Sequence, residues 1–115
     1  MTPTRELAVQ IGQNFDTYAK YTNLTQITLF GGVSQIPQVD TLKKGVDVVI
    51  ATPGRLLDLH KQGFINFDSL HTLVLDEADQ MLDMGFINDV KKIVKLTPKN
   101  RQTLLFSATS VKLSR

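Results

Sequence analysis

Apolar residues along the chain follow two spacings, one typical of helices and the other typical of strands. Helical spacing predicts helices after Pro3, over residues 37–44 and after Thr52, each with a proline suited to its first turn. Gly45 and Gly63 are expected to end the second and third of these helices, because glycine adopts the backbone conformation that closes a helix.

The second half of the chain continues this alternation. A turn or short helix is expected through Met81 and Leu82, and a longer helix is expected to end before Pro98. The longer helix carries an apolar stripe formed by Phe86, Val90, Ile93 and Val94. Runs rich in apolar and β-branched residues predict strands over residues 25–30, 46–51, 72–75 and 103–106. Strands separated by helices imply right-handed crossovers and a mostly parallel sheet covered on both faces, so the predicted fold class is α/β.

Each predicted strand is followed by a short peptide of unusual composition. Ligands of open parallel sheets bind at the carboxyl ends of the strands, which meet at one edge of the sheet. The peptides in question occupy residues 31–32, 52–55, 76–79 and 107–109. The sequence therefore predicts a functional edge formed by these four segments.

Two adjacent carboxylates, Asp76 and Glu77, end the third strand. Two acids beside a buried strand are costly unless a cation or a partner neutralises them. ATPases use such a pair, in which the aspartate holds Mg²⁺ and the glutamate activates the attacking water. A second interpretation is that Asp76 caps the next helix and Glu77 lies in its first turn. On the residues alone the two interpretations are about equally good.

The chain resembles the DEAD-box family of ATP-dependent RNA helicases. Asp76-Glu77-Ala78-Asp79 spells the motif that names the family. Four further segments resemble its motif Ia, its paired glycines, its motif Ib and its motif III, and they occur in the family's order. These segments are residues 3–8, 31–32, 52–55 and 107–109. Any one motif is weak, whereas five in order over residues 3–109 are specific.

The resemblance implies part of a RecA-like domain of the P-loop NTPase type. Residues 1–109 would be the C-terminal part of the first helicase motor domain, followed by a tail over residues 110–115 that need not be native. The chain contains no G-x-x-x-x-G-K-[ST] phosphate loop. ATP and Mg²⁺ are the implied cofactors of the parent helicase, and weak or absent binding is expected for this chain alone. The remainder of the first domain and a second helicase domain are implied partners.

The resemblance also implies roles for residues near the nucleotide. Asp76 would bind Mg²⁺ through its water shell, and Glu77 would be the general base for the attacking water. Asp79 would link to Ser107 and Thr109 and so connect the nucleotide site to RNA unwinding. Without the resemblance, the two hydroxyl residues would be interpreted as ordinary caps at the end of a strand.

A second set of residues would bind the RNA backbone. They share exposed helix starts, flexible glycines and guanidinium groups, all of which suit phosphate. The residues are Pro3, Thr4, Arg5, Glu6, Gly31, Gly32, Thr52, Pro53, Gly54 and Arg55. Taken singly, turn glycines, helix starts and surface arginines are the commoner explanation.

Composition indicates the class of protein and its cellular location but not its function. The 115 residues are 42% apolar and 21% charged, as in a globular domain. The absence of cysteine excludes disulfides and thiolate metal sites. No apolar run approaches the ~20 residues that span a bilayer. We therefore expect a cytoplasmic protein that does not enter a membrane. The net charge of +2 permits nucleic-acid binding without indicating it.

Two alternatives to a helicase segment are a non-enzymatic fragment that binds the RNA backbone and an inert product of truncation. In the family's sheet order, the strand before motif Ia lies beside the strand that ends at Asp76, and the phosphate-loop strand lies beside the one that ends at Ser107. Both neighbours are missing from this sequence. Residues 103–106 should therefore expose an open edge and residues 72–75 should lack one partner, so self-association is expected.

Overall fold

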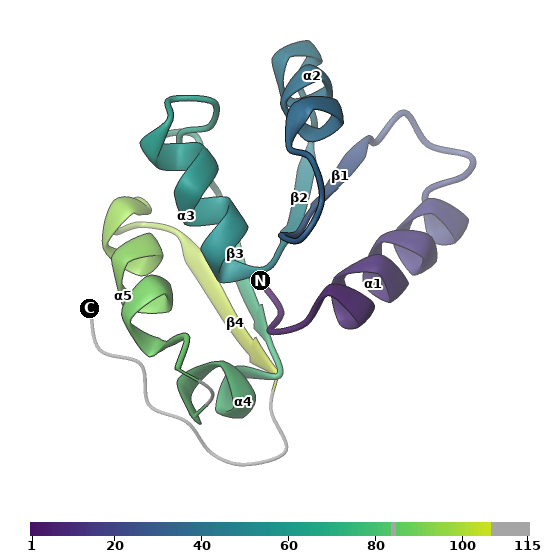
Figure 1. Cartoon of the computed structure of the whole chain (residues 1–115). Helices are drawn as coiled ribbons and strands as arrows, with labels where there is room; N and C mark the ends of the chain where they lie inside the picture. Colours follow the sequence, from purple (N-terminus) through teal and green to yellow (C-terminus); the bar gives the residue numbers. More distant parts are fainter. Residues whose placement is uncertain (84, 107–115) are drawn as a thin grey trace.

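A computed structural model of the chain describes residues 1–83 and 85–106. Helices and strands alternate along it (Figure 1), as the hydrophobic spacing predicts. The helices are α1 (Arg5–Tyr18), α2 (Ile36–Lys44), α3 (Pro53–Lys61), α4 (Ala78–Asp83) and α5 (Ile87–Leu96). The strands are β1 (Gln26–Leu29), β2 (Val48–Ala51), β3 (Thr72–Asp76) and β4 (Gln102–Phe106).

The strands form two parallel pairs. β1 pairs with β2, from Gln26 opposite Val48 onward, and β3 pairs with β4, from Thr72 opposite Gln102 onward. The predicted α/β fold with parallel strands flanked by helices is therefore confirmed. β2 and β3 are not directly hydrogen-bonded to each other.

Met1 and Thr2 join the two pairs at the carboxyl ends of the strands. The Met1 amine donates to the Val74 carbonyl oxygen at 2.6 Å, and the Asp76 N–H donates to the Met1 carbonyl oxygen at 2.9 Å. The Thr2 N–H donates to the Ala51 carbonyl oxygen at 3.0 Å. In a central parallel strand, one residue is hydrogen-bonded to the strand on one side and the next residue to the strand on the other side, as seen here for Met1 and Thr2. This placement agrees with the sheet order that the family resemblance implies for the segment before motif Ia.

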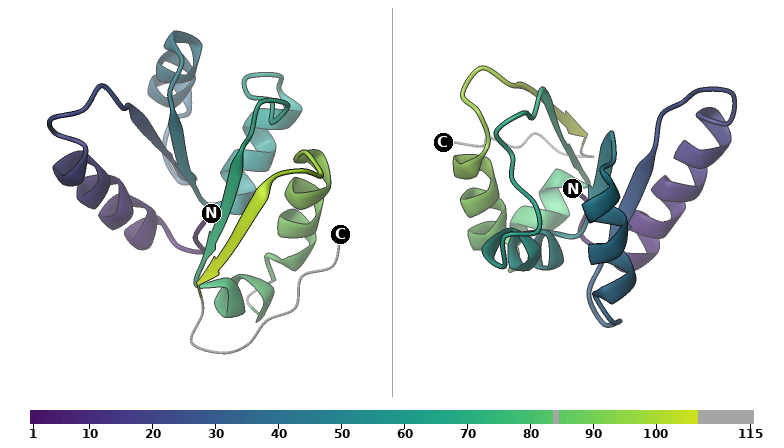
Figure 2. Two further views of the ribbon diagram at one scale, coloured as in Figure 1. Left: turned by 180° about the vertical axis from the view of Figure 1, so that it is seen from behind. Right: turned by 90° about the horizontal axis from the view of Figure 1, so that it is seen from above.

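The apolar core has two parts. One lies between β1, β2 and α3 and includes Leu29 and Leu59, which are fully buried. The other lies between β3, α4 and α5 and includes Met81 and Val90. Met1 packs against both parts. The view from above in Figure 2 shows α1 beside β1 and β2, on the far side of the molecule from α5.

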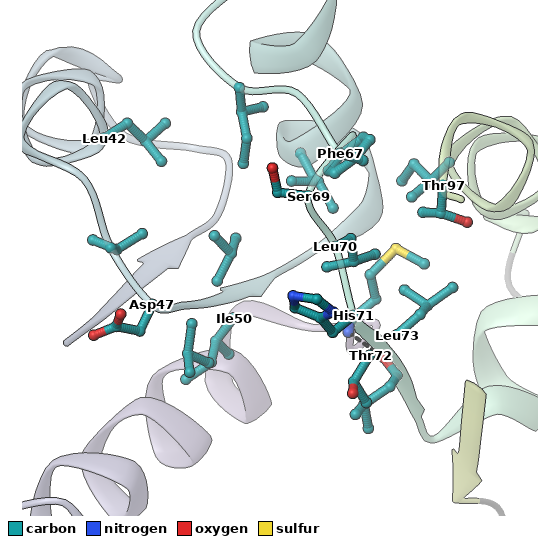
Figure 3. A pocket seen from close by; sticks show the side chains of 18 of the residues that line it. Leu42, Asp47, Ile50, Phe67, Ser69, Leu70, His71, Thr72, Leu73 and Thr97 are labelled. Atoms are coloured by element: carbon teal, nitrogen blue, oxygen red, sulfur yellow. Dashed lines mark hydrogen bonds between the residues drawn. The ribbon is translucent and has the colours of Figure 1, made fainter. Parts of the chain in front are cut away.

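A large groove separates β2 from β3. Its volume is about 1020 Å³, and apolar side chains from both strands and from the flanking helices line it. Ile50 from β2 and Leu73 from β3 are seen from within the groove in Figure 3, together with Phe67 and His71. Met1 and Thr2 lie at its carboxyl end, where they are hydrogen-bonded to both strands.

Candidate nucleotide and RNA site

Three backbone hydrogen bonds align the ends of the strands along one edge. The Thr52 N–H donates to the Leu29 carbonyl oxygen at 3.0 Å, and the bonds of Thr2 to Ala51 and of Asp76 to Met1 complete the series. The segments that follow β1, β2 and β3 therefore leave the sheet at the same edge (Figure 1). Residues 31–32, 52–55 and 76–79 lie at one edge, as predicted, and the function of this edge stays a prediction. Ser107 and Thr109 lie outside the described residues.

The acidic pair lies where β3 ends. Asp76 is the last residue of the strand, and its Oδ1 accepts a hydrogen bond from the Glu77 N–H at 3.1 Å. Glu77 has a φ angle of 54°, a left-handed conformation that costs a non-glycine residue about 1–2 kcal/mol. Such strain persists only where the surroundings impose it, and it clusters at functional sites.

The capping interpretation of this pair does not describe the local structure. Helix α4 begins at Ala78, so Glu77 precedes the helix, and Asp79 is the acidic residue of its first turn. Asp76 bonds the N–H of its direct neighbour instead of an N–H inside the helix. The sharp backbone turn at Glu77 separates the strand from the helix.

Asp76 and Glu77 suit a magnesium–nucleotide complex better than a metal held by protein alone. Both carboxylates are half-buried. Within residues 1–83 and 85–106, no group of three or more acidic, histidine or cysteine side chains is placed to enclose a metal. Mg²⁺ usually keeps several waters and takes one or two carboxylates together with substrate phosphates. The donors at this edge fit that arrangement.

The start of α1 carries the residues of motif Ia. Thr4 is the N-cap, and its Oγ1 accepts a hydrogen bond from the Leu7 N–H at 3.2 Å. The helix therefore begins at Arg5, two residues later than the prediction from Pro3, because the Thr4 side chain makes the capping bond. Pro3 is buried, whereas Arg5 and Glu6 are exposed. The Arg5 guanidinium lies over the Phe30 ring, 4.9 Å from its centroid.

The paired glycines and the start of α3 present open backbone. Gly31 and Gly32 are exposed, and a Cβ placed on either would meet no atom within 4 Å. Gly32 has a φ angle of 82°, which favours glycine. Thr52 caps α3 without a hydrogen bond from its own side chain, and Gly54 beside it is exposed. A phosphate could approach both segments closely.

Arg55, which the sequence analysis assigned to RNA binding, is already hydrogen-bonded within the protein. Its Nη1 donates to Gln38 Oε1 at 2.9 Å, and its Nη2 donates to the Val33 carbonyl oxygen at 2.8 Å. Gln38, which the sequence analysis did not single out, donates in turn from Nε2 to the Phe30 carbonyl oxygen at 3.2 Å. A sequence signal did exist, because Gln38 lies four residues before Leu42 and so shares its apolar helical face.

No helix among the described residues is both long and apolar enough to cross a bilayer.

Comparisons with known proteins identify the family of this chain. The family model for the DEAD/DEAH box helicase matches residues 1–114. The chain is 50% identical over 110 residues to the ATP-dependent RNA helicase DeaD of Buchnera aphidicola, covering 95% of this chain and 18% of that protein. It is 49% identical over 112 residues to the ATP-dependent RNA helicase RhlB of Pseudomonas syringae, covering 95% of this chain and 28% of that protein.

Solved structures show the same fold. A DEAD box protein from the hyperthermophile Methanococcus jannaschii superposes with a TM-score of 0.90 at 42% identity, covering 96% of this chain and 30% of that one. A hypothetical ATP-dependent RNA helicase from Sulfolobus tokodaii gives a TM-score of 0.86 at 42% identity, covering 93% of this chain and 32% of that one. The chain spans less than a third of the length of each of these proteins. Because the family model matches nearly the whole chain and the fold is shared at 42% identity, the chain belongs to the DEAD/DEAH box helicase family.

Proposed function

We propose that the full-length protein containing this chain couples ATP hydrolysis to the unwinding or remodelling of RNA. The observation that carries the proposal is the strained Glu77 beside Asp76, on the same sheet edge as the open backbone of residues 31–32 and 52–54. Relatives at about 50% identity are named as ATP-dependent RNA helicases, which supports this assignment.

The acidic pair divides the nucleotide chemistry between two residues. Asp76 orients the water shell of Mg²⁺, which offsets the phosphate charge when it is bound. Glu77 accepts a proton from the attacking water. Its left-handed backbone conformation ends the path of β3 at this residue. Asp79 lies in the first turn of α4 and carries the third carboxylate of the motif. We assign it the link to Ser107 and Thr109.

RNA is bound through its backbone. The amide groups at the starts of α1 and α3 attract phosphate, because the N–H groups of a first helical turn lack partners within the helix. Arg5, which is exposed, adds a guanidinium at the same edge. Contacts of this kind position the strand without identifying its bases, so weak sequence preference is expected.

A strand-displacement assay tests the proposal. The full-length protein is given a short RNA duplex with a single-stranded extension, either with ATP and Mg²⁺ or with a non-hydrolysable ATP analogue. We expect displacement with ATP only, accompanied by RNA-stimulated phosphate release. RNA binding without ATP-dependent displacement or hydrolysis would overturn the proposal and favour a protein that binds the RNA backbone without turnover.

A further inference from the structure

Gln38 and Arg55 join three segments that the sequence separates. Gln38 belongs to the first turn of α2 and Arg55 to the first turn of α3, and both bond to the loop that follows β1. Their hydrogen bonds reach the carbonyl oxygens of Phe30 and Val33, the two residues that flank the paired glycines. The loop is therefore held at both ends by side chains from the two helices.

Gln38 is buried, and both ends of its amide are hydrogen-bonded within this link. Gln38 is 8% exposed and is one of three buried polar residues in the described part of the chain. A buried amide is costly unless both its oxygen and its nitrogen are paired. Here the oxygen accepts from Arg55 and the nitrogen donates to Phe30. The guanidinium strengthens the bond to the Gln38 oxygen, since charge-assisted hydrogen bonds are roughly twice as strong as neutral ones.

The conformation of the loop depends on contacts from other segments, because its two glycines have no side chains that could pack. Gly31 and Gly32 carry no side chains, and no atom lies within 4 Å of where their Cβ atoms would be. Fixing one residue in a single backbone conformation costs free energy, and glycine loses the most freedom. A loop that is already fixed by its flanking carbonyls avoids much of this cost when it binds a ligand.

We propose that Gln38 and Arg55 are positioning residues that preorganise the paired-glycine loop and the start of α3 for RNA phosphate. Arg55 acts through the loop and does not itself contact phosphate. Both arms of its guanidinium fork are used within the protein. The inference rests on the proposed RNA-binding function and adds Gln38 to the residues that support it.

Conservative substitutions in the full-length protein test this inference through RNA affinity. Arg55→Lys keeps the charge but loses the fork, and Gln38→Leu keeps the shape but removes both hydrogen bonds. Each should weaken binding of single-stranded RNA by about tenfold, which is the loss of roughly 1.4 kcal/mol of preorganisation. The double variant should bind RNA only slightly more weakly than whichever single variant has the lower affinity, because the two residues form one network.

The salt dependence of binding separates positioning from direct contact. Arg55→Ala should leave the log–log salt slope unchanged, whereas the control Arg5→Ala should flatten it by roughly 0.7, the value for one phosphate contact on a single strand. Amide hydrogen exchange of Gly31 and Gly32 should become faster in Gln38→Leu, and correctly folded variants should keep the thermal transition of the wild type within a few degrees.

Each outcome has one meaning. A flattened slope for Arg55→Ala, or wild-type RNA affinity in both Gln38→Leu and Arg55→Lys, would overturn the positioning role while leaving RNA binding intact. Absence of RNA binding by the wild-type protein would instead overturn the proposed function. Loss of affinity explained fully by a smaller folded fraction would reduce Gln38 and Arg55 to ordinary structural residues and would also overturn the inference.

Discussion

Glu77 adopts a left-handed backbone conformation, and the other described residues with positive φ angles are all glycines. The carboxylate is retained at a position where glycine would be less strained. A residue that is unfavourable for folding but suited to the chemistry is expected at a catalytic site.

This strain can be measured in the chain itself. Glu77→Gly should be more stable than Glu77→Ala by roughly 1 kcal/mol, because alanine keeps the left-handed strain and glycine relieves it. At an ordinary exposed position the order is reversed or the difference is small. Urea denaturation of the two variants provides the comparison, and equal stabilities would show that the backbone at Glu77 is not strained.

The Met1 amine makes stability depend on pH. Burial lowers the pKa of this ammonium group from 8.0 to about 6, and the neighbouring Asp76 carboxylate opposes the shift. Between pH 6 and 8 the unfolded chain holds a proton that the folded chain has lost. The stability from this group is therefore present above pH 8 and is lost as the pH falls to 6, by roughly 2–3 kcal/mol in total.

Denaturation in urea at pH 6 and at pH 8 measures this difference. Chain acetylated at the amino terminus is the matched control, because it lacks the titrating amine but retains His60 and His71. The unmodified chain should gain stability across the window, and the acetylated chain should gain much less. The same gain in both would show that the Met1 amine is not the source of the pH dependence.

Single residues differ in how far the sequence could place them. Asp76 and Glu77 were located correctly because they directly follow an apolar strand. The hydrogen bonds of Arg55 were missed because its partners, Gln38 and Val33, lie 17 and 22 positions away. The φ angle of Glu77 was also missed, since tertiary structure imposes it against local preference.

Secondary-structure elements were predicted well in kind and less well at their ends. The strand predicted from residue 46 begins at Val48. Asp47 lies outside the strand, and its Oδ2 accepts hydrogen bonds from both the N–H and the Oγ1 of Thr25. Side-chain bonds of this kind make an element begin later than apolar spacing suggests. The same explanation holds for Thr4 at the start of α1.

The contact between α1 and β1 depends on a glycine. A Cβ added to Gly12 would lie 2.5 Å from Thr28 Oγ1, which is closer than real atoms approach. Gly12→Ala should therefore destabilise the chain by about 1–3 kcal/mol, although alanine is the better helix former.

A double-mutant cycle identifies the cause. Thr28→Ala removes the hydroxyl that the new methyl group would meet. Gly12→Ala combined with Thr28→Ala should cost clearly less than the sum of the two single changes in urea denaturation. Additive costs would mean that the close approach of α1 and β1 is not what the glycine permits.

At the scale of the whole molecule, the spacing of strands and helices indicated the fold class but could not give the sheet order. The pairing of β1 with β2 and of β3 with β4 joins segments about 20 to 30 residues apart. Only the family resemblance indicated a place beside Asp76 for the segment before motif Ia, and Met1 and Thr2 occupy that place.

The groove between β2 and β3 is expected to control association of this chain. Val49 and Thr72 direct backbone groups toward the groove, as the alternation of a parallel ladder requires. Unpaired ladder groups beside apolar side chains favour pairing with another chain. We expect oligomers of the unmodified chain in light scattering at micromolar concentration.

Filling the groove should remove this association. Four apolar, β-branched residues fused before Met1 should give a monomer and raise the melting temperature by at least about 5 °C, whereas four serine and glycine residues should not. A compact monomer of the unmodified chain, with a concentration-independent melting transition, would contradict the account of the groove.

The central claim is that the carboxyl edge of the sheet forms the hydrolytic part of an RNA-dependent ATPase. The most direct test is the rate of RNA-stimulated ATP hydrolysis by the full-length protein with Glu77→Gln. This change keeps the size and hydrogen-bonding capacity of the side chain but removes the base. Turnover should fall by roughly two or more orders of magnitude while ATP remains bound. A rate close to that of the wild type would contradict the claim.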